Sequence, residues 1–225
     1  MKFILKGTPP TEFEAWKKQD QPTAWSQLGS NLPKKREKGL VYYSKNQLRT
    51  ALYIEQKGLC CYCNSKIEND YKTTSIEHVE PRMGDKITER IFDYNNLALS
   101  CDNRIEKLNS KDYYCDAKKQ ENTIDLTPFM TECETEIYFL ENGEIKSHTE
   151  RAKRTINVLN LHHVALDNRR EAAIIPYIYS DSTSDNPKDI LSKKELKANF
   201  DLLLNNHHIE YWSSIVSVLK RYLNL

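Results

Sequence analysis

The architecture of this chain is set by a short cysteine-rich stretch, Gly58-Leu59-Cys60-Cys61-Tyr62-Cys63. Two residues separate Cys60 from Cys63, a gap that lets both thiolates reach one tetrahedral zinc ion from a tight turn. A single pair of this kind is a modest signal, because redox proteins share the spacing. Cys101 and Cys115 offer two further ligands. The sequence therefore predicts one structural Zn²⁺ bound by all four thiolates.

The compartment bears on how the cysteines are interpreted. No run in the 225 residues approaches the ~18 apolar residues that cross a bilayer, and residues 1–10 are too short for a signal-peptide core. We therefore expect a cytoplasmic protein with no membrane contact, where reducing conditions favour metal-bound cysteines over disulfides. Cys61 adjoins a ligand and Cys133 lies past the module, so both are expected to be buried structural residues.

The net charge of +1 is unevenly distributed along the chain. Residues 1–59 contain eleven basic and five acidic side chains, a net charge of +6, whereas residues 60–120 carry −1 and residues 121–225 carry −4. A notable part of the basic excess is the run Lys34-Lys35-Arg36-Glu37-Lys38. Such an arm could hold phosphates beside a nearly neutral module. A solvated surface accounts for the charges alone at least as well.

A second motif lies between the cysteine pairs. It reads Ser75-Ile76-Glu77-His78-Val79-Glu80-Pro81-Arg82, and Asn96-Leu97-Ala98-Leu99-Ser100-Cys101 follows it. The combination of Cys-x-x-Cys, acid-His, Pro and Asn-Leu-x-x-x-Cys resembles the HNH (ββα-metal) endonuclease family over residues 60–119. The resemblance implies an α+β fold, with a small zinc-stapled ββα-metal module and a mainly helical remainder.

The chemistry of that family explains why these residue types are needed. Phosphodiester hydrolysis needs a nucleophilic water and a cation that neutralises developing charge. By the resemblance, His78 is the general base, and Glu77 and Asp116 bind a catalytic ion, for which oxygen ligands suit Mg²⁺ or Mn²⁺. Asn96 is expected to brace the loop that bears the histidine. Because neighbouring strand residues face opposite ways, we expect a turn or bulge to bring Glu77 and His78 to one site.

The sequence departs from the family pattern after the third cysteine. Arg104 stands where a further cysteine would close a short knuckle. The next candidate is residues 114–119, Tyr-Cys-Asp-Ala-Lys-Lys, whose Cys-x-x-x-Lys end is similar to the family's final helix after an insertion. Cys115 and Asp116 are assigned as metal ligands on this basis. Arg82 and Lys119 are either phosphate contacts or solvated cations.

The flanking residues narrow the resemblance. Residues 48–52 and 55–63, followed by the acid-His-x-x-Pro-Arg motif, are similar to the HNH nuclease subunit of Septu-type antiphage systems, a family that includes retron-associated nucleases. Residues 157–161 with Leu166 and Arg169-Arg170 are similar to the C-terminal helical region of that family. This resemblance covers roughly residues 45–172. It implies a nuclease held by a separate ATPase subunit and released to cut nucleic acid during phage infection.

The chain divides into three predicted segments. Residues 1–59 form a basic arm and helix, residues 60–125 the nuclease module, and residues 126–225 a hairpin followed by helices. The expected elements are a helix capped by Ser44 and ending near Gly58, a hairpin at Asn142-Gly143, a helical stretch over 151–174 that breaks near Asn160, a loop over 180–190, and two closing helices, the last with a core-facing apolar stripe.

Three functions stay open from the sequence. The leading hypothesis is a DNase, and a ribonuclease would use the same residues. The second class is a non-catalytic zinc module that binds nucleic acid or a protein partner. The set Glu77, His78 and Asp116 favours catalysis, because a scaffold has no need of an acid-base pair. The other histidines, at positions 148, 162, 163, 207 and 208, are interpreted as structural or surface residues.

Overall fold

The computed structural model describes residues 1–106, 109–180 and 189–225. Within these residues helices combine with small antiparallel sheets, so the predicted α+β class is confirmed at this level. Residues 181–188 of the predicted loop lie outside the described part. The helices and strands are α1 (Thr11–Asp20), α2 (Lys45–Glu55), β1 (Thr74–His78), α3 (Thr88–Ile91), β2 (Leu97–Cys101), α4 (Asp116–Lys119), β3 (Ile137–Phe139), β4 (Ile145–Ser147), α5 (Glu150–Val158), α6 (Val164–Ile178), α7 (Lys193–Asn205) and α8 (Trp212–Leu223).

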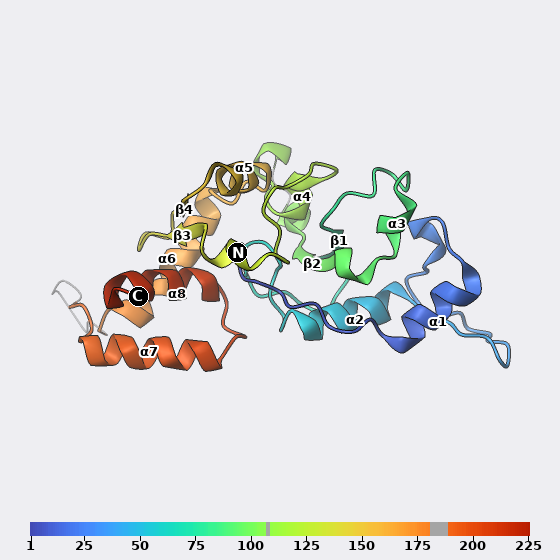
Figure 1. The fold of residues 1–225 in the computed structure, drawn as a ribbon, viewed down its shortest axis with the longest axis horizontal. Coiled ribbons are helices and arrows are strands. Elements are labelled where there is room, and N and C mark those ends of the chain that lie inside the picture. Colours follow the sequence, from blue (N-terminus) through green and yellow to red (C-terminus); the bar gives the residue numbers. More distant parts are fainter. Residues whose placement is uncertain (107–108, 181–188) are drawn as a thin grey trace.

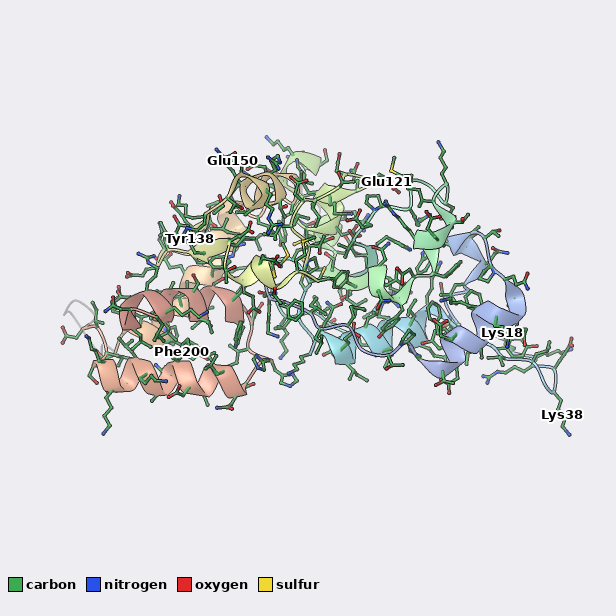
Figure 2. All side chains as sticks on the ribbon, in the orientation of Figure 1. Lys18, Lys38, Glu121, Tyr138, Glu150 and Phe200 are labelled. Atoms are coloured by element: carbon green, nitrogen blue, oxygen red, sulfur yellow. The ribbon has the colours of Figure 1, made fainter. Side chains whose placement is uncertain are left out.

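The N-terminal segment supplies one end of the elongated molecule (Figure 1). Helix α2 begins where predicted, because the Ser44 hydroxyl accepts a hydrogen bond from the Gln47 amide at 3.3 Å. It ends at Glu55, since Lys57 and Gly58 adopt positive φ angles of 56° and 71°. The basic run 34–38 is exposed, and Lys38 lies at the outer tip of its loop (Figure 2).

The middle of the molecule is built on the antiparallel pair β1 and β2. The register runs from Thr74 opposite Cys101 to His78 opposite Leu97. Helix α2 packs against β2, and the short helix α4 follows Cys115 as predicted. The motif residues Glu77 and His78 therefore lie on a strand, and Asp116 begins the helix beside it.

The C-terminal segment follows the predicted order of elements. Strands β3 and β4 pair antiparallel through a turn at Gly143, whose φ is 77°. A Cβ on Gly143 would lie 1.9 Å from the Asp167 carbonyl oxygen in α6, so only glycine fits there. The predicted break falls between α5 and α6, where Asn160 has a φ of 50°.

The closing helices complete the core. Helix α8 packs against α6, α7 and β3, and its predicted apolar stripe is buried at Trp212, Ile215, Val216 and Leu219. The buried apolar side chains form one connected cluster that reaches from the N-terminal segment to α8. The division into three segments stays a prediction. No helix among the described residues is both long and apolar enough to cross a bilayer.

Candidate functional site

The four predicted zinc ligands lie together. Cys60 and Cys63 come from the turn after α2, Cys101 ends β2, and Cys115 precedes α4. All four sulfurs lie within 4.8 Å of one another, with Sγ–Sγ distances of 3.9 Å for Cys60–Cys115 and 3.8 Å for Cys63–Cys101. Four thiolates around a tetrahedral ion at about 2.3 Å would stand about 3.8 Å apart. The cluster therefore fits one metal ion, and it is the only such group found among the described residues.

The sulfurs are supported by hydrogen-bond donors. The Cys101 amide donates to Cys60 Sγ at 3.4 Å, and the Ser65 amide donates to Cys63 Sγ at 3.4 Å. Donors of this kind stabilise thiolates. Cys61 and Cys133 are buried outside the cluster, as predicted, and burial raises the pKa of each thiol. These two side chains therefore behave as neutral core residues.

Glu77 lies in a buried polar contact that the sequence did not reveal. Its Oε1 atom accepts hydrogen bonds from the Tyr62 hydroxyl at 2.9 Å and from Lys119 Nζ at 2.8 Å. The side chain of Lys119 has no exposed surface, and its ammonium also donates to the His78 carbonyl at 3.1 Å. Both interpretations given to Lys119 are therefore wrong, because it is neither solvated nor open to a phosphate. It is the cation that partners Glu77.

Asp116 brings a second carboxylate to Glu77. Its Oδ2 atom accepts hydrogen bonds from Ser75 Oγ at 2.6 Å and from Arg104 Nη2 at 3.3 Å. The Asp116 side chain also lies within hydrogen-bond reach of Glu77. Burial chiefly, and Asp116 next, raise the pKa of Glu77 well above its usual range, against the opposing effect of Lys119. The two acidic side chains therefore lie together, and each has one oxygen held by neighbouring donors.

Arg104 is the residue that replaces the expected knuckle cysteine. Asp102 holds its guanidinium through two hydrogen bonds, Nε to Oδ1 at 2.7 Å and Nη2 to Oδ2 at 2.9 Å. The same Nη2 reaches Asp116. The departure from the family pattern therefore places a half-exposed cation beside the second candidate metal ligand.

His78 faces away from the carboxylates. The pairing of β1 with β2 is regular through His78, so the expected turn or bulge is absent and the two neighbouring side chains alternate across the strand. Its Nε2 lies 3.0 Å from the Ile91 carbonyl oxygen and must donate to it, which leaves Nδ1 as the atom able to accept a proton. The Trp25 ring packs edge-on against the His78 ring, with 4.7 Å between the two ring centroids.

Burial sets the charge of His78. The residue is 8% exposed, and burial lowers its pKa to about 4, although the Ile91 carbonyl opposes the shift. The imidazole is therefore neutral at pH 7. The contact from Trp25, far away in the N-terminal arm, had no signal in the sequence.

Asn96 makes the predicted brace. Its Oδ1 accepts from the Glu80 amide at 2.7 Å and its Nδ2 donates to the Glu80 carbonyl at 2.9 Å. The Val79 amide also donates to the Asn96 carbonyl at 3.0 Å. These bonds fix the backbone that leaves β1 directly after His78.

No protein-family model matches the chain, and no curated protein matches it. The assignment of a function therefore depends on the residues and contacts described above.

Proposed function

We propose that this chain is a metal-dependent HNH endonuclease that hydrolyses phosphodiester bonds of DNA, and that it serves as the nuclease subunit of an antiphage complex with a separate ATPase. The observation that carries the proposal is the meeting of the acidic side chains of Glu77 and Asp116, each held by neighbouring donors, beside a cluster of four cysteines. The ATPase and the antiphage role rest on the sequence resemblance alone.

The cysteine cluster fits a structural Zn²⁺. Its four sulfurs have tetrahedral spacing and come from the turn after α2, the end of β2 and the start of α4. A bound ion would connect these three places and contribute to the folding free energy. The turn, strand and helix that it joins are the ones that carry the motif residues.

The carboxylate pair fits a divalent ion with hard oxygen ligands. Glu77 and Asp116 would hold Mg²⁺ or Mn²⁺, which when bound neutralises charge on the phosphate group. Lys119 and Tyr62 fix one oxygen of Glu77, while Ser75 fixes one oxygen of Asp116. These contacts orient the remaining oxygens and reduce the repulsion between the two acids.

His78 is the proposed general base. The bond from Nε2 to the Ile91 carbonyl fixes the tautomer and the ring, so Nδ1 is the atom that takes the proton of the attacking water. Because His78 ends β1 and faces away from Glu77, the phosphate must lie across the end of the strand. Asn96 keeps that end of the strand in place.

One observation favours the non-catalytic alternative. His78 is almost fully buried, with Trp25 against its ring, and Glu77 already has an ammonium partner. A zinc module that only binds nucleic acid or protein would show no cleavage by the wild-type chain with any divalent ion. The same assay therefore separates the two functions.

The test is a cleavage assay of the zinc-loaded protein on DNA and RNA, with Mg²⁺ or Mn²⁺, alone and with the candidate ATPase. His78→Ala is expected to lower the rate by about 10²–10⁴-fold, with unchanged zinc content. His148→Ala, at an exposed histidine in the C-terminal hairpin, is the matched control and should cut normally. A His78→Ala protein that cuts at the wild-type rate would end the role of His78 as general base and with it the HNH assignment.

A further inference from the structure

A second polar site lies on the far side of the cysteine cluster. A cavity of about 300 Å³ is bounded by the first residues of the chain, the end of α2 and the connection between α7 and α8. Figure 1 shows the first residues of the chain, which lie in neither a helix nor a strand, beside the end of α2 near this connection. The cluster residue Cys60 contributes to the wall. None of the motif residues Glu77, His78 or Asp116 lines this cavity.

Three basic side chains line the cavity, and they come from three separate parts of the chain. They are Lys2 in the first segment, Lys57 after α2, and His207 after α7. In the described part of the chain neither lysine forms an ion pair. Burial first, then the charges of Lys2 and Lys57, lower the pKa of His207. The three groups are therefore close enough to repel one another.

The acidic residues nearby do not neutralise this cluster. Glu55 lines the cavity, but its carboxylate is committed to Lys6 Nζ at 2.5 Å and to the Gly7 amide at 2.7 Å. Burial lowers the pKa of Lys2, and the charge of Glu134 opposes this shift. Glu134 Oε1 accepts a hydrogen bond from the Phe3 amide at 2.9 Å. At least one positive charge in the cavity is left without an anionic partner.

Trp212 holds two of the basic groups in place. Lys2 Nζ lies 5.4 Å from the centre of its indole ring, and the His207 ring lies 5.3 Å from it. His207 Nδ1 is shielded from solvent and has no hydrogen-bond partner among the residues that the structure describes. A buried ring nitrogen without a partner is costly, and a protonated ring that donates to an anion would remove the cost.

We propose that this cavity binds a phosphate group, carried either by a nucleic-acid strand or by a free nucleotide. Lysine ammonium groups bind phosphate as point charges, and two lysines line the cavity. The volume exceeds that of a phosphate alone and is at the lower end of ordinary ligand pockets. The site would bind its ligand whether or not the chain is a nuclease.

The test measures binding without catalysis. Zinc-loaded full-length protein, in buffer without Mg²⁺ or Mn²⁺, is titrated with a fluorescent single-stranded oligonucleotide over about 50–200 mM salt, and separately with adenosine monophosphate and inorganic phosphate. The variant Lys2→Gln/Lys57→Gln removes two charges and keeps side-chain length. Lys18→Gln is the control, an exposed lysine of α1 that lies far from the cavity (Figure 2). Zinc content and circular dichroism check that each variant folds.

Two results support the proposal and identify the source of the phosphate. If a strand occupies the cavity, the slope of log K against log salt for the double variant should fall by about 1.4, that is about 0.7 for each lost contact with a single strand. If a free nucleotide occupies it, the affinity for adenosine monophosphate should fall about tenfold or more, with the oligonucleotide slope unchanged.

The proposal is overturned if the folded double variant binds all three probes like the wild type, or if Lys18→Gln weakens binding as much. His207→Gln gives an independent reading, because it leaves the lysines intact and should also weaken phosphate binding. None of these measurements involves cleavage. These binding measurements can therefore refute the phosphate-site proposal without bearing on the nuclease proposal, which the cleavage assay tests.

Discussion

Replacing Lys119 by methionine tests whether the buried ion pair organises the candidate site. The side chains of Lys119 and Glu77 are 0% and 6% exposed, and Nζ lies 2.8 Å from Oε1. Removing one partner of a buried pair leaves an uncompensated charge, which typically costs about 3–5 kcal/mol. The lost hydrogen bond to the His78 carbonyl adds about 1 kcal/mol. For a chain of this length, the pair alone corresponds to a fall in melting temperature of roughly 6–20 °C.

The assay is urea unfolding of zinc-loaded protein, followed by circular dichroism. Lys118→Met, at the partly exposed neighbour in α4, is the matched control and should change stability by less than about 0.5 kcal/mol. The double variant Lys119→Met/Glu77→Gln removes both charges and should recover part of the loss. If Lys119→Met alone costs under about 1 kcal/mol, or if the double variant is no better than the single one, the ion pair does not organise the site.

Three further predictions address the metal cluster, the hairpin and the arm. In elemental analysis the zinc content of Cys115→Ser should fall below about one ion per chain, and its cooperative unfolding should be lost. The control Cys133→Ser should keep the zinc content of the wild type. Gly143→Ala should cost more than the ~1–2 kcal/mol of a positive φ alone, because its Cβ meets backbone at 1.9 Å. Gly39→Ala, also at positive φ but with open space around it, is the comparison in urea unfolding. Trp25→Ala should slow cleavage roughly 2- to 13-fold, the equivalent of an aromatic contact of about 0.5–1.5 kcal/mol on His78; normal cleavage would exclude a positioning role for that ring.

Elements with strong local signals were predictable from the sequence. The Ser44 cap, the Asn142-Gly143 turn and the break at Asn160 each depend on a few adjacent residues whose backbone preferences are specific. The grouping of the four cysteines was also predictable, because thiolates expected to share one ion must converge whatever the chain does between them. The insertion after Cys101 did not hide Cys115, the fourth member of the cluster.

The contacts of the candidate site were less predictable. Lys119 was expected to be a phosphate contact or solvated, yet it is the buried partner of Glu77. The spacing of the two residues in the sequence does not predict this ion pair. A lysine near the end of a module is exposed unless a buried acid needs it. The Trp25 contact with His78 joins residues from distant parts of the chain, and such pairings are set by tertiary packing.

The regular strand gives the two central side chains different surroundings. Glu77 points to the face that carries Tyr62, Lys119 and Asp116, whereas His78 points to the face closed by Trp25 and the Ile91 carbonyl. On the first face two acidic side chains lie together, and their oxygens are the ligand type that a divalent cation prefers. On the second face burial keeps the imidazole neutral at pH 7 and lowers its pKa, so Nδ1 is unprotonated but the ring is a weaker base than an exposed histidine. Because Lys119 bonds both Glu77 and the His78 carbonyl, one buried ammonium connects the two faces, and its loss should affect both.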